Sequence, residues 1–142
     1  MYFDDLKVGM SVQIAPAVIE KEKMIDFARN YDPIRLHTDE AYAAASPFGA
    51  LIAPGVMSFM SVWAKYLEQD FFGTELLAGK STKIEWHKPV YAQDVLHGHA
   101  EITRLEKRSR RNGIVEITIK AYNQNNVLVL SDVTEAIVKC RE

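Results

Sequence analysis

The chain has 142 residues, of which 48% are hydrophobic and 25% charged, and its formal net charge is −2. This composition predicts one globular domain over residues 1–142, and it argues against intrinsic disorder and against electrostatic attraction to nucleic acid. The single cysteine, Cys140, excludes an intramolecular disulfide. The N-terminus has no leader-like pattern, and no apolar run approaches the ~20 residues of a membrane span. We therefore expect a cytoplasmic protein with no membrane contact.

The first half of the chain predicts one strand followed by helices. Residues 11–19 read as a strand, and residues 20–31 switch to apolar side chains at helical spacing. Pro33 ends that helix, because proline cannot continue the hydrogen-bond ladder. Thr38 is expected to cap a short helix over residues 39–45, whose first turn carries acidic side chains that favour the helix dipole.

A longer helix follows over residues 54–67. Pro54 suits its first turn, and apolar side chains nearly all round the helix predict burial on most faces. The segment therefore reads as the central helix of the fold.

Four segments in the second half alternate apolar and polar side chains, which is typical of strands. Asn112 and Gly113 form a hairpin-turn signal between two of them, and Asn125 with Asn126 marks the next turn. The expected strands cover residues 81–87, 95–105, 115–121 and 127–138. Strands that follow helices in this way predict an α+β fold, with an antiparallel sheet laid on one central helix.

The chemically informative residues lie just before the central helix. Asp32 and His37 place a carboxylate and an imidazole five residues apart, in a segment that Pro33 is expected to keep out of regular helix. Pro54 and Gly55 open the central helix and leave free N–H groups at its positive end. An acid–base pair beside such a helix start suits chemistry next to a carbonyl group. Asp32 alone also suits a turn, and His37 alone a structural histidine, but their combination favours function.

These residues make the chain resemble the MaoC-like dehydratases, a family that includes (R)-specific enoyl-CoA hydratases. The matching positions are Asp32, His37, Thr38-Asp39-Glu40, Ala53-Pro54-Gly55 and Lys88-Pro89-Val90. The resemblance spans nearly the whole chain. It implies a single hot-dog fold, in which a curled antiparallel sheet wraps around a long central helix, and a homodimer or a multiple of dimers.

The resemblance also implies an activity in fatty acid metabolism. Such an enzyme adds water to, or removes it from, the C2–C3 bond of an enoyl thioester carried by CoA or an acyl carrier protein, without a cofactor or a metal. The implied catalytic residues are Asp32 and His37, which hold a water between them, and Gly55, whose N–H binds the thioester carbonyl. The implied substrate-binding residues are Ile34, Pro54, Ser58 and Trp63.

The chain departs from the family pattern at three positions. Ile34 stands where the family has an amide, Arg35 replaces the usual proline, and Trp63 takes the place of a serine on the central helix. Bulkier side chains shorten a pocket, so these departures predict a short or compact acyl group with Trp63 as the wall.

Two other functions stay open, a hot-dog acyl-CoA thioesterase and a non-catalytic protein that binds acyl thioesters. The common thioesterases carry their acid on the central helix, whereas the acids nearest that helix here, Glu68 and Asp70, come late. The substitutions at Ile34 and Arg35 keep the non-catalytic interpretation open.

Two further groups of side chains have both a plain and a functional interpretation. His97 and His99 share a strand face with His87 expected one strand away, which suits a wet strand face better than a metal site because no carboxylate or cysteine has ligand-like spacing. The basic turn over residues 107–111 suits a solvated loop, but it also suits contact with the phosphates of CoA.

Overall fold

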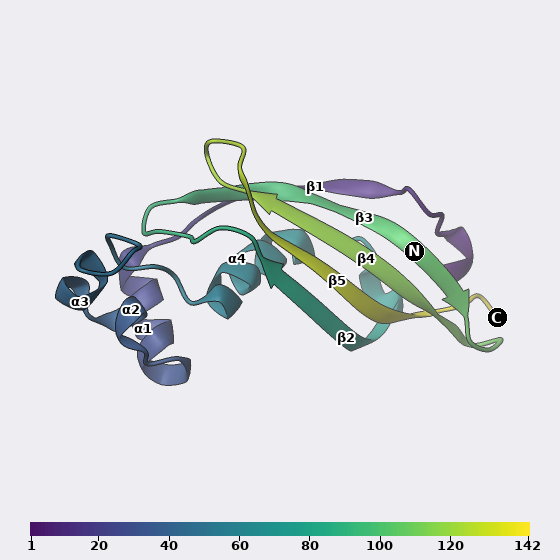
Figure 1. Cartoon of the computed structure of the whole chain (residues 1–142). Helices are drawn as coiled ribbons and strands as arrows, with labels where there is room; N and C mark the ends of the chain where they lie inside the picture. The colour runs from purple at the N-terminus through teal and green to yellow at the C-terminus, as the bar shows by residue number, and fades with distance from the viewer.

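A five-stranded antiparallel sheet forms most of the protein in a computed structural model that describes all 142 residues (Figure 1). The strands lie in the order β1-β3-β4-β5-β2. Their bounds are β1 (Ser11–Val18), β2 (Leu76–Trp86), β3 (Val95–Lys107), β4 (Asn112–Tyr122) and β5 (Leu128–Lys139). The long strands β3, β4 and β5 are consecutive in sequence and adjacent in space, as short hairpin connections require.

The sheet curls around helix α4 (Gly55–Leu67), while three shorter helices form a separate lobe at one end (Figure 1). Those helices are α1 (Lys21–Tyr31), α2 (Arg35–Thr38) and α3 (Glu40–Ala44), and two 3₁₀ turns cover Phe3–Asp5 and Gly73–Glu75. An ion pair between Lys21 and Glu40 joins α1 to α3. The curled antiparallel sheet around a central helix confirms the expected α+β architecture. None of the helices is long and apolar enough to cross a lipid bilayer.

Apolar side chains from the inner face of the sheet and from α4 form the core. Met57, Phe59, Val62 and Tyr66 are the large buried residues of α4. The expectation that α4 is buried on most faces is only partly met, because one side of it stays open. Together with side chains on β2, that side forms an apolar stripe, defined as Val56, Met60 and Leu67 of α4 and Leu76, Leu77 and Trp86 of β2, each 40–53% exposed.

Three local expectations are corrected by the structure. The segment after Pro33 forms one helical turn, α2, where non-helical backbone was expected. The cap of α3 is Asp39, whose Oδ1 accepts the N–H of Tyr42 at 3.0 Å; Thr38 instead donates its hydroxyl to the Ile34 carbonyl. Asp39 caps α3 because it lies directly before the helix, where its side chain reaches the free N–H groups of the first turn.

The third correction concerns the hairpin between β3 and β4. Asn112 and Gly113 are the first residues of β4, and the turn is made by the four residues before them. A Cβ at Gly113 would lie 2.4 Å from the Phe3 ring, so this glycine allows an aromatic ring to pack on the strand. Gly113 thus serves close packing against Phe3 and does not form the turn.

The two edges of the sheet differ. β1 carries Pro16 within a bulge between Ile14 and Ala17, and proline offers no N–H to a neighbouring strand. β2 pairs only with β5, and nearly all its residues are exposed. One edge is therefore irregular, while the other is long, partly apolar and unpaired.

Candidate active site

Asp32 and His37 form a dyad, the two side chains facing each other where the first two helices meet. α1 ends at Tyr31, Asp32 is its C-cap, and Pro33 turns the chain into α2, which carries His37. The His37 Nε2 atom lies 3.3 Å from Asp32 Oδ2. The imidazole is only 6% exposed whereas the carboxylate is 44% exposed, so the carboxylate lies at the open side of the pair.

The other ring nitrogen of His37 fixes the tautomer of the neutral imidazole. His37 Nδ1 lies 2.7 Å from the carbonyl oxygen of Ile52, and a carbonyl only accepts hydrogen bonds. In neutral His37 the proton is therefore on Nδ1, and Nε2 presents a lone pair toward Asp32. Two acceptors 3.3 Å apart leave no room for a molecule directly between them, so a water that donates to both lies beside the pair, on its open side.

Gly55 is the first residue of α4, and it borders the same open hollow as Asp32 and His37. Its N–H and those of Val56 and Met57 make no hydrogen bond within the chain, and the first N–H to find a backbone partner is that of Ser58, which donates to the Pro54 carbonyl at 3.1 Å. Free N–H groups at a helix start attract an oxyanion, since the helix dipole adds positive potential there. Pro54 is the N-cap, one residue before its expected place in the first turn.

The indole of Trp86 packs directly on Gly55. Trp86 Nε1 donates to the Gly55 carbonyl at 2.9 Å, and a Cβ at position 55 would lie 2.5 Å from the ring. Only glycine fits beneath the ring without displacing it. Trp86 comes from the end of β2, so the edge strand helps to hold the helix start in place.

These groups line one open hollow of about 500 Å³. Of the catalytic and substrate-binding residues expected from the sequence, it contains Asp32, His37, Gly55 and Ser58. Ser58 is buried, and its hydroxyl donates to the Pro54 carbonyl at 3.4 Å. A carboxylate, an imidazole and a helix start thus border the same space, as general acid–base chemistry on a carbonyl compound requires.

Three residues expected in the substrate site do not line this hollow. Ile34 is the N-cap of α2 with its side chain 49% exposed, and Pro54 is buried. Trp63 lies two turns further along α4 in a different cavity. The expectation that Trp63 closes the space beside Asp32 and His37 is therefore corrected. Gly55 and Trp63 lie eight residues apart on α4, so their side chains point at different parts of the sheet.

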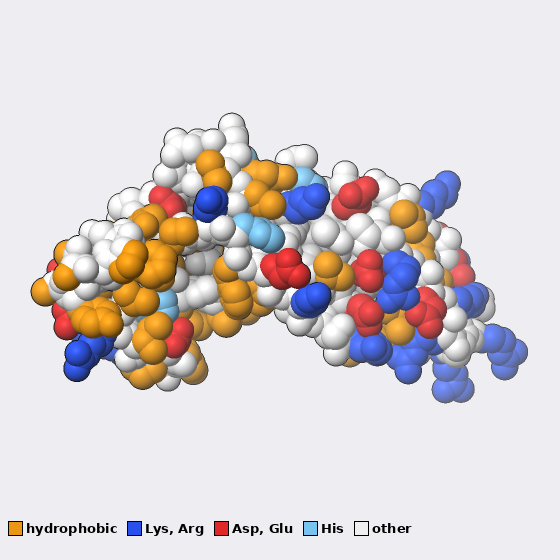
Figure 2. All heavy atoms as spheres, viewed as in Figure 1, with side chains coloured by type: hydrophobic (Ala, Val, Ile, Leu, Met, Phe, Trp, Pro, Cys, Tyr) orange, Lys and Arg blue, Asp and Glu red, His pale blue; other side chains and the backbone are white.

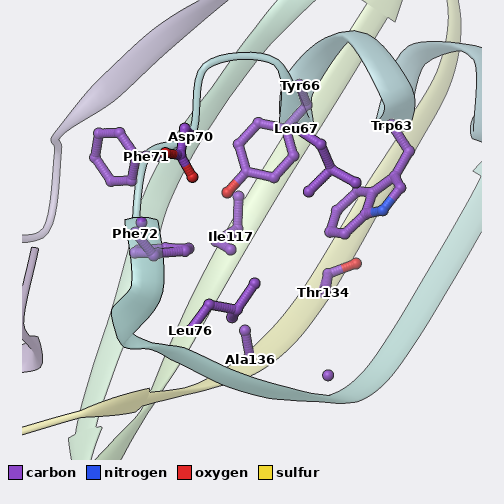
Figure 3. Close-up of a pocket in the computed structure, with 12 residues that line it drawn as sticks. Trp63, Tyr66, Leu67, Asp70, Phe71, Phe72, Leu76, Ile117, Thr134 and Ala136 are labelled. Carbon is purple, nitrogen blue, oxygen red and sulfur yellow. The ribbon is translucent and has the colours of Figure 1, made fainter.

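The second cavity lies under the last turns of α4 and holds about 100 Å³ (Figure 3). Trp63 and Tyr66 reach into it from the helix, and their rings contact each other at a centroid distance of 5.1 Å. Burial raises the pKa of the Tyr66 phenol well above its usual range, so the hydroxyl stays neutral. Apolar side chains line most of this cavity.

A buried carboxyl group lies on the sheet between the two spaces. Asp132 is fully buried on β5; its Oδ2 accepts the Thr134 hydroxyl at 2.6 Å, and its Oδ1 has no partner. Thr134 lines the second cavity and lies 2.7 Å from the Thr82 hydroxyl. Burial raises the pKa of Asp132 to about 6, because a charged carboxylate loses its hydration there.

The hollow contains further residues that the sequence analysis did not assign to the site. Trp86 and Phe48 contribute aromatic surface, and His87, Lys88 and Val90 follow the end of β2. The run from position 88 to 90 had a signal in its match to the family pattern. Trp86 had none, because its contact with Gly55 joins residues 31 positions apart.

The three histidines considered as metal ligands are not brought together. His97 and His99 on β3 both stack on Tyr122, and His97 Nε2 lies 3.2 Å from the Asn123 carbonyl. His87 contacts Ser131 near the opposite edge, with β4 and β5 between it and β3. The expected single-strand separation is therefore wrong.

Known proteins are similar to this chain in sequence and in fold. A family model described as "MaoC like domain" matches residues 5–125. The uncharacterized protein YdeM of Bacillus subtilis is 28% identical over 98% of this chain and 99% of its own. The MaoC-like dehydratase of Rhodospirillum rubrum superposes with a TM-score of 0.86 at 25% identity, covering 100% of this chain and 99% of that one. The (R)-hydratase of A. caviae, involved in PHA biosynthesis, gives 0.75 at 25% identity over 96% and 98%. These likenesses confirm the expected hot-dog fold.

Proposed function

The chain belongs to the MaoC-like domain family, and from this premise we propose that it is an enoyl thioester hydratase or dehydratase. The reaction joins the hydroxyl of water to C3 and a proton to C2 of a 2-enoyl thioester, or runs in reverse. The structural likeness to the (R)-hydratase of A. caviae supports this reaction class. The substrate is an acyl thioester of CoA or of an acyl carrier protein.

The observation that carries the proposal is the 3.3 Å contact between His37 Nε2 and Asp32 in a hollow that also contains the free N–H of Gly55. The thioester carbonyl accepts the Gly55 N–H, which stabilises negative charge on its oxygen as C3 is attacked. Asp32 and the lone pair of His37 Nε2 hold the attacking water and take its proton. The pair then returns a proton to C2, so that one water is added overall.

The hollow gives less support to a thioesterase. Asp32 is the only carboxylate that lines it, whereas Asp70 lines the second cavity and Glu68 pairs with Lys65 at 3.1 Å. The acid that common thioesterases place on the central helix has no counterpart beside Gly55.

We infer further that the protein works as a homodimer paired along β2. Pairing would satisfy the open N–H and C=O groups of this edge strand and cover the apolar stripe. Because Trp86 belongs both to the stripe and to the hollow, the dimer would also close one side of the active site. Light scattering at micromolar concentration tests this assembly, and a clean monomer would contradict it.

The activity is tested by incubating the protein with crotonyl-CoA. We expect formation of the hydroxyacyl-CoA, measured by chromatography, with no release of free thiol, measured with a thiol reagent. Thiol release without a hydroxylated product would identify a thioesterase. Binding of the thioester with neither product would identify a non-catalytic protein.

A further inference from the structure

Aromatic side chains gather around the second cavity, under the last turns of α4. Four of them line it, those of Trp63, Tyr66, Phe71 and Phe72. In Figure 3, Trp63 and Tyr66 reach into the cavity from the helix, and Phe72 comes from the segment between α4 and β2. Aromatic rings attract cations through the negative potential of their faces, and groups of rings form the cages that hold alkylated ammonium ions.

The hydroxyl of Tyr66 has no hydrogen-bond partner within the chain. The residue is only 4% exposed, and Figure 3 shows its phenol pointing into the cavity. A buried tyrosine hydroxyl normally finds a partner, because leaving it unpaired costs free energy. The neutral phenol therefore offers its hydrogen bond to a molecule inside the cavity.

The cavity contains carboxyl groups without a countercharge. Asp70 is the only charged residue in its lining, and it is exposed and forms no ion pair. Thr134 also lines the cavity; its hydroxyl donates to Asp132 at 2.6 Å and leaves the second carboxyl oxygen of Asp132 free.

No Lys, Arg or His lines the cavity. On the outer surface the charges are balanced differently, since Figure 2 shows acidic and basic side chains mixed at the end of the molecule where Figure 1 places both termini. The charge of the lining therefore favours a cation over an anion.

The volume of the cavity limits the size of its ligand. It holds about 100 Å³, and apolar cavities of about 150 Å³ hold one benzene molecule, so it has room for about four or five heavy atoms. Water suits it poorly, because a buried water typically makes about three hydrogen bonds and most of this lining is apolar. A metal ion suits it poorly as well, since one carboxylate does not make a set of ligands.

The segment that carries Asp70 and Phe72 is held in place. The N–H of Asp70 donates to the Leu67 carbonyl at 3.0 Å, and the N-terminal ammonium group of Met1 donates to the Phe72 carbonyl at 3.1 Å. The side chains of this segment are thus positioned in advance, which lowers the entropy lost on binding a ligand.

The second cavity is separate from the dyad hollow, and the two share no lining residue. Gly55 and Tyr66 lie near opposite ends of α4, about 16 Å apart along its axis at about 1.5 Å per residue. A ligand of the second cavity therefore needs no contact with the thioester.

We propose that the second cavity binds a small protonated alkylamine. The alkyl groups lie against the aromatic rings, the N–H donates to the Tyr66 oxygen, and Asp70 supplies the countercharge. Trimethylammonium, which has a single N–H and fits the volume, is the probe that matches this lining. The site is independent of the hydratase reaction.

The first experiment compares trimethylammonium, tetramethylammonium and tert-butanol by calorimetry. Tetramethylammonium keeps the charge but has no N–H, and tert-butanol is of similar size without a charge. We expect trimethylammonium to bind about tenfold more tightly than tert-butanol, because cation–π attraction in a partly desolvated cavity contributes about that factor. The methyl proton resonances of both cations should shift upfield through the ring currents of the aromatic side chains. Equal or tighter binding of tert-butanol, or no binding of the cations, would overturn the proposal.

The second experiment removes the two polar groups in turn. Tyr66→Phe should weaken trimethylammonium about tenfold, the range for a hydrogen bond to a charged group, and leave tetramethylammonium unchanged. It should not cost stability, because the hydroxyl has no partner to lose. Asp70→Asn should weaken both cations about threefold and leave tert-butanol unchanged, since an exposed carboxylate contributes little. Tyr42→Phe and Asp26→Asn, at exposed positions on other helices, are the matched controls.

Unchanged binding of trimethylammonium to Tyr66→Phe would contradict the proposal, as would an equal loss of tert-butanol in Asp70→Asn. Loss of the cation in His37→Ala, or its displacement by crotonyl-CoA, would place it in the dyad hollow and also exclude the second cavity. If the protein binds the cation as expected but hydrates no thioester, the amine site stands and only the proposed function fails.

Discussion

The two ends of α4 border spaces of opposite character. At the first turn, Gly55 and Ser58 face an open hollow with a carboxylate and an imidazole. At the last turns, Trp63 and Tyr66 enclose a smaller space lined mainly by apolar side chains (Figure 3). One helix therefore joins an open region with polar side chains to a smaller, mainly apolar cavity.

The difference follows from how the chain enters and leaves the helix. Pro33 and Pro54 interrupt regular structure beside the first turn, and such breaks leave polar backbone groups free to meet a ligand. At the other end, the aromatic side chains of Trp63, Tyr66 and Phe72 line the space between the helix and the sheet. Reactive groups and packing groups are thus separated along one element, and substitutions should separate their effects.

The largest expected effect is on the dyad. Asp32→Asn and His37→Ala should each lower hydratase turnover about 10³-fold, within the range for loss of a general acid or base. Steady-state kinetics on crotonyl-CoA measure the loss, and circular dichroism checks that the fold survives. Near-normal turnover in both variants would reject the catalytic assignment.

The apolar end should respond in stability. Trp63→Ser should cost about 3 kcal/mol of unfolding free energy, because it removes a partly buried indole and leaves a cavity. Urea denaturation measures the cost, and Trp63→Phe, which keeps most of the ring volume, should cost clearly less. Since Trp63 lies outside the dyad hollow, chain-length preference should stay unchanged. Acceptance of longer acyl chains would show that the two spaces join when substrate binds.

A smaller loss is expected at the helix start. Gly55→Ala keeps the N–H but places a methyl group against the Trp86 ring, so the ring or the donor must move. A displacement of about 1 Å beside the reacting atoms can cost about 10²-fold in turnover. Kinetics of the single variant and of Gly55→Ala/Trp86→Ala test this cause. If removing the ring does not recover part of the turnover, the steric explanation is wrong.

The smallest effect concerns Asp132, between the two spaces. Its pKa is raised to about 6 from the ordinary 3.8, so the folded protein holds a proton that the unfolded chain releases, and stability should fall as pH rises from about 4 through about 6. Asp132→Asn should remove this fall and stabilise the protein by about 2 kcal/mol at pH 8. Unfolding curves at pH 5 and pH 8 measure it; equal stabilisation at both values would exclude titration as the cause.

Much of the fold was predictable because its signals are local and repeated. The alternation in β3, β4 and β5 and the helical spacing in α1 each extend over many residues. Asp32, His37 and Gly55 were found because loop-forming prolines flank them. Their meeting in one hollow could only be inferred through the family resemblance.

What the sequence did not reveal depends on distant contacts. α2 forms where the His37 ring reaches the Ile52 carbonyl, and Gly113 lies in a strand because Phe3 packs on it. The side chains of the apolar stripe along α4 and β2 are of the same types as those of the core, so the sequence alone does not distinguish them from buried residues. Only the three-dimensional arrangement distinguishes surface that is left open from surface that is buried.

The bulge with Pro16 in β1 bears on how far assembly can proceed. If pairing occurs through β2, the outer edges of the joined sheet are two copies of β1, each bent and lacking an N–H at the proline. Such edges do not template a further strand, so growth ends at a closed pair and does not continue into fibres. A straightened β1 would remove this protection against edge-to-edge aggregation.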